Sequence, residues 1–309
     1  MKNARIVKKR RWRDYAFLLF ILPAMIWVIS FSIYPFMYSI IISFTNMSLL
    51  RPDSAKFIFL DNFIELFTLD KAFGVSVLRS FVFTTFVVFF QFALGFFLAL
   101  LLNKKIRFTP IVRMSVMLPW VLPPIALSLI WAWVLRAGNL GLLNSVLLKF
   151  GIGNVNWFGY AIAMFSIIFI TIWIGVPFSF MLELASLQKI PDEIYEAASV
   201  DGAGSLQKLL YITIPYMKDT FRINLIMITI ATVGYFDVIY AITDGGPMDA
   251  TEVLPMYMYH TAFKSFNMGK GSAIAVSMLL MSLLYTILYI FIFREKKEKV
   301  YEEPASEIE

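Results

Sequence analysis

The stretch Glu196-Ala-Ala-Ser-Val-Asp-Gly-Ala-Gly204, followed by Ile212-Thr-Ile-Pro215, is a polar, Ala- and Gly-rich segment set between two strongly apolar segments. The chain of 309 residues is 60% hydrophobic with a mean hydropathy of +0.75, whereas soluble domains have about 45–50% apolar residues. The composition therefore predicts an integral membrane protein. A polar segment of this kind is not needed to cross a bilayer, so we expect it to contact something outside the bilayer.

The apolar segments on either side of this stretch predict six transmembrane helices. A helix needs about 20 apolar residues to cross the hydrocarbon. Uncharged windows of that length place the spans at about 15–44, 79–102, 113–136, 159–186, 219–243 and 271–294. The predicted fold class is thus all-α integral membrane. The apolar run after the basic residues 1–14 is too long for a signal peptide, so we expect a retained anchor. We expect Pro35 to break the first window, with the remainder at the outer surface.

The distribution of Lys and Arg predicts how these spans are oriented. With the N-terminus inside, 19 of the 27 Lys and Arg residues lie on the inner side and 8 on the outer side. Because cytoplasmic loops carry the excess of positive charge, both termini, including the tail 295–309, are predicted to be cytoplasmic. The polar segment 187–217 is then cytoplasmic as well. The net charge of +6 reflects these flanking residues, and a nucleic-acid partner is not expected.

The third predicted span contains three prolines, Pro119, Pro123 and Pro124. Each removes a backbone donor and crowds the preceding turn, so one unbroken helix cannot hold all three. Freed carbonyls at membrane depth are tolerated inside a bundle or beside a water-filled cavity. A packing kink and a cavity lining are both open interpretations. Trp120, within the same motif, is a candidate gating or substrate residue.

The fourth and fifth predicted spans each carry a face of mixed chemistry. By helical spacing these faces consist of Thr171, Ile174, Gly175 and Phe178, and of Ile228, Ala231, Thr232 and Tyr235. Hydroxyls beside aromatic rings suit a sugar, whose C–H groups stack on rings. A small-residue contact between helices also explains the fourth-span face, and the residues alone favour it. Asp237 follows near the outer end, where substrate contact, a structural hydrogen bond and outer gating are all open.

The polar segment itself predicts a compact knob made of a helix, a turn and a second helix. Pro191 opens the first helix, with Asp192 and Glu193 in its first turn. Gly202 breaks that helix, and the second helix is expected to stop before Pro215. A plain connection between spans can be much shorter than about 30 residues, so the length favours docking of a partner.

The composition also excludes several kinds of chemistry. The chain has no cysteine and a single histidine, His260, so neither thiolate nor histidine-based metal sites are expected. It has no phosphate-binding loop motif. We therefore predict that the chain is not an enzyme and that it binds no metal.

The polar stretch resembles the EAA motif of ABC importer permeases. The match rests on Glu196-Ala-Ala, Asp201-Gly-Ala, Ile212 and Pro215, in order and spacing. The carbohydrate-uptake branch of that family is similar at Leu118-Pro-Trp-Val-Leu-Pro-Pro and at Tyr240-Ala-Ile-Thr-Asp-Gly-Gly-Pro247. The chain is most similar to the maltose-type first permease, but it lacks the additional N-terminal helices and the large periplasmic insertion of that type.

The resemblance implies partners and a mode of action. These are a second permease subunit, two ATPase subunits that hold the ATP and Mg, and an extracytoplasmic solute-binding protein, in a bacterial or archaeal cytoplasmic membrane. No cofactor would be bound by this chain. The residues implied to couple to the ATPase are Ile194, Glu196, Ala197, Ala198, Asp201, Gly202 and Ala203.

The resemblance also implies that the faces on spans four and five hold the substrate. Thr171, Thr232 and Tyr235 stand where the maltose site has other side chains, so a sugar other than maltose is expected. One alternative is an importer of a polyol phosphate such as glycerol phosphate, although no Lys or Arg lies on these faces. A stand-alone secondary carrier or channel is the alternative of a different class, and it would show inverted repeats or paired broken helices.

Overall fold

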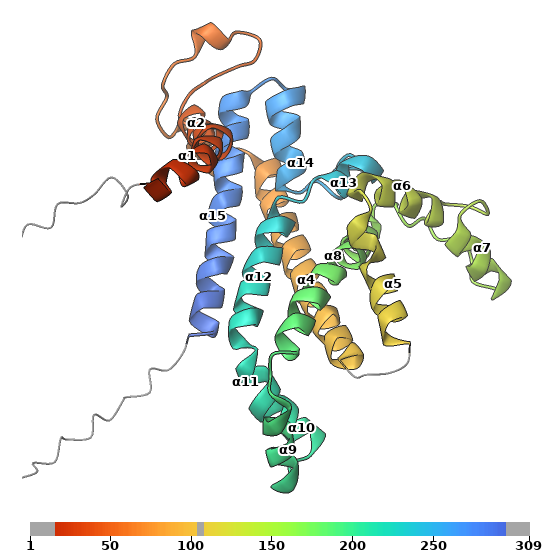
Figure 1. Cartoon of the computed structure of the whole chain (residues 1–309). Coiled ribbons are helices and arrows are strands. Elements are labelled where there is room, and N and C mark those ends of the chain that lie inside the picture. The colour runs from red at the N-terminus through yellow and green to blue at the C-terminus, as the bar shows by residue number, and fades with distance from the viewer. Residues whose placement is uncertain (1–15, 104–107, 295–309) are drawn as a thin grey trace, which may run out of the picture. The chain divides into compact units, whose positions relative to one another are not determined.

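The computed structural model of the chain describes residues 16–103 and 108–294 (Figure 1). The predicted basic N-terminus 1–14 and tail 295–309 lie outside the described residues. Within the described ranges the regular elements are helices joined by loops, with isolated bridges at Thr45–Phe57 and Ser48–Asn267. The chain divides into two compact units, residues 1–71 with 258–276, and residues 72–257 with 277–309.

The first unit begins with one long apolar helix and includes the start of the last one. Its elements are α1 (Ala16–Val28), the π-helical turn Ile29–Ile33, α2 (Tyr34–Ile42), the 3-10 turn Pro52–Ser54, α3 (Asp61–Thr68), the π-helical turn His260–Lys264 and the first turns of α15 (Met268–Ile292). Asn62 on α3 holds the chain after α2, because its Nδ2 donates to Ser43 O and Thr45 O, both at 2.8 Å.

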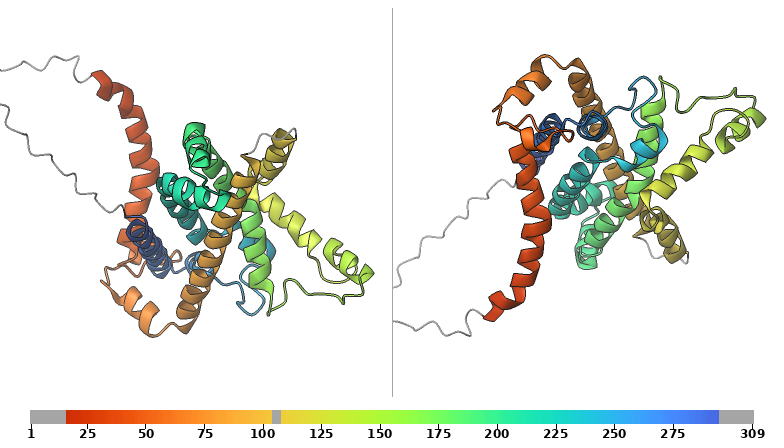
Figure 2. Two further views of the ribbon diagram at one scale, coloured as in Figure 1. Left: turned by 90° about the horizontal axis from the view of Figure 1, so that it is seen from below. Right: turned by 90° about the horizontal axis from the view of Figure 1, so that it is seen from above.

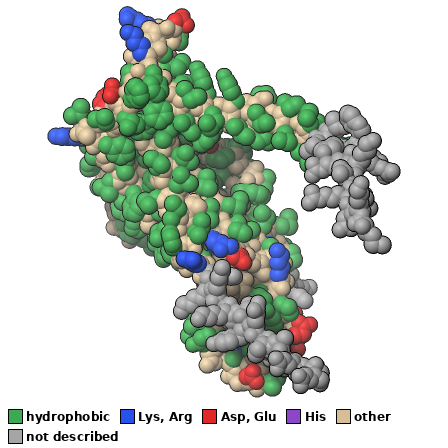
Figure 3. Space-filling view, turned by 90° about the vertical axis from the view of Figure 1, so that its left-hand side faces the viewer, with side chains coloured by type: hydrophobic (Ala, Val, Ile, Leu, Met, Phe, Trp, Pro, Cys, Tyr) green, Lys and Arg blue, Asp and Glu red, His purple; other side chains and the backbone are tan. Residues whose placement is uncertain are grey.

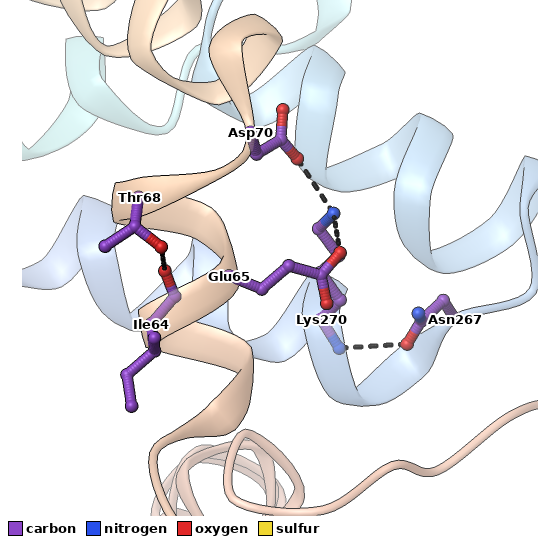
Figure 4. Close-up of polar contacts among 6 residues, drawn as sticks. All are labelled: Ile64, Glu65, Thr68, Asp70, Asn267 and Lys270. Atoms are coloured by element: carbon purple, nitrogen blue, oxygen red, sulfur yellow. Dashed lines mark hydrogen bonds and ion pairs between the residues drawn. The ribbon is translucent and has the colours of Figure 1, made fainter.

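A charged cluster ties α3 to the start of α15 within this unit. Lys270 Nζ lies 2.9 Å from Glu65 Oε1 and 2.8 Å from Asp70 Oδ2 (Figure 4). The backbone N–H of Lys270 also donates to Asn267 Oδ1 at 3.1 Å. Since Asp70 and Lys270 are largely shielded from solvent, the two carboxylates supply the charged partners that a shielded ammonium requires.

The second unit is built around three helices, α4 (Lys71–Leu102), α8 (Ala163–Leu187) and α12 (Lys218–Val233), which lie side by side in Figures 1 and 2. The other helices are α5 (Thr109–Val121), α6 (Pro124–Val134), α7 (Leu142–Lys149), α9 (Asp192–Val200), α10 (Ser205–Lys208), α11 (Ile214–Tyr216), α13 (Asp237–Ile242), α14 (Leu254–Tyr259) and the remainder of α15.

Two apolar clusters form the interior of the second unit. One gathers around Ile167, Ile170 and Val238, and the other around Phe180, Met217 and neighbouring residues of α4 and α8. Many large apolar side chains remain exposed, and they cover much of the face drawn in Figure 3. Such surfaces are what a protein immersed in lipid requires, because the bilayer covers them.

The described residues contain five helices long and apolar enough to cross a membrane. They are Phe20–Ile42, Lys71–Leu102, Ala163–Leu187, Lys218–Ile242 and Met268–Ile292. The pair α5 and α6 becomes a sixth if it is counted as one broken span, with a bend of 102° between its halves. The all-α multi-pass fold is confirmed. The break at the prolines is also found, since α5 ends at Val121 and α6 begins at Pro124.

Two expectations about prolines are wrong. The helix does not break at Pro35 but continues to Ile42, and helical structure continues past Pro215 to Tyr216. In both places a π-helical turn precedes the proline, at Ile29–Ile33 and at Leu209–Thr213. A proline ring crowds the carbonyl four residues before it, and that carbonyl lies within the π turn in each case. The wider turn relieves the clash, so the helix is not ended.

Candidate functional site

The segment from Pro191 to Tyr216 forms the knob in the second unit. Pro191 is extended and α9 begins directly after it, with Asp192 and Glu193 in the first turn. Gly202 closes α9 in the left-handed conformation, with φ of +80°. The N–H groups of Gly202 and Ala203 donate to the carbonyls of Ser199 and Ala198 at 3.1 and 2.8 Å. This is the Schellman arrangement, which requires a residue that accepts positive φ.

Side-chain contacts attach the knob to the transmembrane helices. The Tyr195 hydroxyl on α9 lies 2.8 Å from Thr213 Oγ1, so the two helical segments of the knob are joined. Lys208 Nζ on α10 also donates a hydrogen bond to Ser199 Oγ on α9. Tyr195, Ile212 and Ile214 pack against the apolar cluster at the ends of α4 and α8. The knob is therefore packed onto the transmembrane core.

The outer surface of the knob is open to a partner. None of the α9 residues is fully buried. Of the residues predicted to couple, Glu196, Ala197, Asp201 and Gly202 are exposed, and Ile194, Ala198 and Ala203 are half-buried. The small side chains on α9 leave its backbone accessible at close range.

The predicted face of α8 divides into different environments. Thr171 and Ile174 are buried, and Thr171 Oγ1 has no hydrogen-bond partner among the described residues. Phe178 is half-buried and its ring centroid lies 6.5 Å from that of Trp120 on α5. The structure thus brings together two of the predicted residues from different spans.

Gly175 on the same face makes a close contact between helices. Gln91 Nε2 on α4 donates to Gly175 O at 3.0 Å. A Cβ added at Gly175 would lie 2.4 Å from Gln91 Oε1, so a side chain there would require the Gln91 amide to move and give up its hydrogen bond to Gly175 O. The small-residue contact that the sequence left open is present at this position.

The predicted face of α12 is partly buried and partly open. Ile228 and Thr232 are buried, Ala231 is exposed, and Thr232 Oγ1 donates to Ile228 O at 2.6 Å. Tyr235, just after α12, has a buried hydroxyl with no partner among the described residues. The Tyr235 hydroxyl can therefore still form a hydrogen bond with a ligand, as can the Thr171 hydroxyl on α8.

Asp237 lies just beyond α12, two residues after Tyr235. It is exposed and is the first residue of α13, where a carboxylate is favoured by the helix dipole. A cavity of about 780 Å³ lies on the opposite face of α8, lined among others by Phe90, Trp173 and Val176. Its apolar lining does not include the eight residues predicted to hold substrate.

The sequence interpretation overlooked one buried polar group. Glu183 on α8 is fully buried, and its Oε1 accepts a hydrogen bond from Asn224 Nδ2 on α12 at 2.9 Å. The signal was present in the sequence, because a carboxylate lay inside the fourth apolar span. Glu183 lies within the predicted span 159–186, and an acid within a span is by default a functional candidate.

Comparison with known proteins identifies the family. Residues 91–297 match the family described as binding-protein-dependent transport system inner membrane component. The chain belongs to this family. The match contains the knob and the faces of α8 and α12. Together with the relatives named next, it confirms the resemblance to ABC importer permeases of the carbohydrate-uptake branch.

Relatives of this permease cover nearly its whole length. It is 34% identical to the sulfoquinovosyl glycerol transport system permease protein SmoG of Agrobacterium fabrum, over 93% of this chain and 94% of that protein. It is 33% identical to the trehalose/maltose transport system permease protein MalF of Thermococcus litoralis, over 91% and 94%. A chain of a bacterial alginate ABC transporter has a similar fold, with a TM-score of 0.78, 20% identity and coverage of 91% and 95%.

Proposed function

We propose that this permease is the transmembrane subunit of an ATP-driven, solute-binding-protein-dependent ABC importer for a sugar or oligosaccharide. The family supports the importer class. The relatives support a carbohydrate, because two of them are named as permeases for sulfoquinovosyl glycerol and for trehalose or maltose. A stand-alone carrier or channel is disfavoured by the same family membership.

The observation that carries this proposal is the construction of the knob. Its outer face exposes Glu196 and Ala197, whereas Tyr195 and Ile212 pack against the ends of the transmembrane helices. A partner that moves the outer face therefore acts on α8 and α12 through packed side chains. This is the arrangement that a lever between a cytoplasmic ATPase and a bundle needs.

The proposed mechanism follows from that lever. ATP and Mg are held by two ATPase subunits, and closure of the ATPase pair moves the knob. This chain and a second permease then switch between inward- and outward-facing states, and the translocation path between the two permeases receives substrate from the docked solute-binding protein. The switch requires partners that bind the two states with different affinity. Both termini of this chain lie on the cytoplasmic side in the proposal.

The substrate is proposed to contact the faces of α8 and α12. The unpartnered hydroxyls of Thr171 and Tyr235 can hydrogen-bond a polyhydroxyl ligand, and Phe178 beside Trp120 offers an aromatic surface for its C–H groups. No Lys or Arg lies on these faces, so the polyol phosphate alternative would need a cation from the second permease.

Crosslinking tests the coupling part of the proposal. The chain has no cysteine, so Ala198→Cys and Ala197→Cys introduce single reactive sites on the knob. We expect each to crosslink to an ATPase subunit that co-purifies with the permease. Leu140→Cys, exposed between α6 and α7, is the matched control and should not crosslink. Absence of an ATPase from the purified complex would refute the importer assignment.

Substrate class needs a separate measurement. Thermal-shift screening of the cognate solute-binding protein against a panel of sugars and polyol phosphates should give stabilisation by a sugar. Thr171→Val in the reconstituted importer should then raise the KM for that sugar by about tenfold, the loss of one hydrogen bond to substrate. An unchanged KM in Thr171→Val and in Tyr235→Phe would remove these faces from the substrate path.

A further inference from the structure

A row of buried polar side chains crosses the second unit from α4 to α12. Gln91 Nε2 donates to Gly175 O at 3.0 Å and lies 3.4 Å from Ser179 Oγ. Ser179 Oγ on α8 donates to Asn224 Oδ1 on α12 at 3.2 Å. Asn224 Nδ2 in turn donates to Glu183 Oε1 at 2.9 Å. Three of these side chains, Ser179, Glu183 and Asn224, are 0% exposed.

Glu183 ends this row with one oxygen unsatisfied. Its Oε2 has no hydrogen-bond partner among the described residues. That oxygen lies against α4, because a Cβ added at Gly95 would be 3.0 Å from it. The neighbouring positions on α8, Phe180 and Leu184, belong to an apolar cluster. A single hydrogen bond from an amide does not offset the free-energy cost of removing an ionised carboxylate from water in such apolar surroundings.

Several charged and titratable groups on the surrounding elements have partners other than Glu183. The facing part of α4, from Gln91 to Ala99, contains none. On α5, α12, α15 and the knob, the partnered groups include Arg113 Nη2 with Leu102 O, Arg222 with Asp219, Tyr289 with Thr229 and Tyr195 with Thr213. The Nε of Arg113 is buried and has no hydrogen-bond partner among the described residues. The described residues also contain no group of three or more His, Cys, Asp or Glu side chains that could hold a metal ion.

We propose that Glu183 is a proton-binding site in the transmembrane core, occupied when α4, α8 and α12 are packed as they are here. The heavy atoms accommodate the proton without rearrangement. The oxygen and nitrogen of an amide are interchangeable in shape, so a reversed Asn224 amide places Oδ1 2.9 Å from Glu183 Oε1 and Nδ2 3.2 Å from Ser179 Oγ. The protonated carboxyl then donates to Asn224, and Asn224 donates to Ser179.

This site links a proton to helix packing. Gly95 on α4 closes over the Glu183 carboxyl, and Ser179 Cβ would lie 2.5 Å from a Cβ at that glycine. Water reaches Glu183 Oε2 if α4 moves away, and an ionised Glu183 gains solvation from that movement. Loss of the proton therefore favours separation of α4 from α8, and protonation favours the packed arrangement. The inference concerns this chain alone and does not depend on the transported substrate.

Infrared spectroscopy of the purified full-length chain tests the proposal. At neutral pH we expect the C=O stretching band of a protonated carboxylic acid in the wild type. This band should be absent from Glu183→Gln. It should remain in the control Glu65→Gln, because the Glu65 carboxylate is paired with Lys270. Asn224→Ala should shift the frequency of the band, because the hydrogen bond to the carboxyl is removed.

Stability against pH gives a second readout. The packed state holds a proton that an exposed glutamate releases above about pH 4.3. The folded state therefore binds more protons than the unfolded state above that pH, and stability falls as pH rises. In Glu183→Gln, the slope of the free energy of unfolding against pH should decrease by the equivalent of one bound proton. Glu65→Gln should leave this slope unchanged.

Three results would overturn the proposal. One is a folded wild type at neutral pH without a band that depends on residue 183. Another is a band that neither Glu183→Gln nor Asn224→Ala alters, and Asn224→Ala keeps this test available if Glu183→Gln does not fold. The third is a free energy of unfolding that depends on the Na⁺ concentration and not on pH. Such a result would mean that Glu183 binds a metal cation and not a proton.

Discussion

Single glycines decide how closely the helices of the second unit approach. At Gly95 of α4, an added Cβ would lie 2.5 Å from Ser179 Cβ and 3.0 Å from the backbone nitrogen of Phe180. The backbone of α8 cannot yield as a flexible side chain can. Gly74 on the same helix has no atom within 4 Å of an added Cβ, so the two positions form a matched pair.

Gly95→Ala should lower the free energy of unfolding by about 1–3 kcal/mol, the usual effect of overpacking. Gly74→Ala should instead raise it by about 0.5–1 kcal/mol, because alanine is favoured over glycine within a helix. Denaturation of both variants in detergent, followed by circular dichroism, measures the difference. Equal effects of the two substitutions would show that α4 and α8 are not in close contact at Gly95.

Gly202 is constrained by its conformation and not by its surroundings. Its φ is +80° and nothing lies within 4 Å of an added Cβ. Gly202→Ala should therefore destabilise the knob by about 1–2 kcal/mol through backbone strain alone. Hydrogen exchange of the α9 amides measures this. Gly204→Ala, at φ of −72°, is the control and should leave exchange unchanged.

At the scale of elements, a hydroxyl pair joins the two helical segments of the knob, beside the contact of Lys208 with Ser199. Tyr195 on α9 and Thr213 in the following π-helical turn lie 2.8 Å apart. In a double-mutant cycle, Tyr195→Phe and Thr213→Val should give a coupling energy of about 0.5–1.5 kcal/mol. Urea unfolding of the four proteins gives this value. A coupling energy of zero would mean that the two hydroxyls do not bond in solution.

Over the whole molecule, the charge distribution predicts a topology that cysteine labelling can test. Val200→Cys on the knob should react with a membrane-impermeant maleimide only in inside-out vesicles. Leu140→Cys should react only in right-side-out vesicles. Both positions are highly exposed, at 88% and 75%, so access is not limited by packing. Labelling of both positions from the same side would refute the proposed orientation.

The sequence alone determined the membrane class, the apolar spans, the break at Pro123 and Pro124, and the family to which the chain belongs. Each depends on local chemistry: apolar length, charge asymmetry, the missing proline N–H group and a motif with fixed spacing. Continuation of the helices past Pro35 and Pro215 could not be inferred in this way. The compensating π turns depend on backbone geometry, and their flanking residues carry no distinctive pattern.

Only the tertiary structure decided which polar residues meet. The helical spacing of Thr171, Gly175 and Phe178 placed them on one face, yet it did not reveal that Gln91 fills the space beside Gly175. Nor did it pair Glu183 with Asn224, which is 41 residues away in the chain. Periodicity defines the face of one helix, whereas the partner of that face depends on how separate helices pack. The knob could therefore be found from its sequence, and the buried row from Gln91 to Glu183 required the fold.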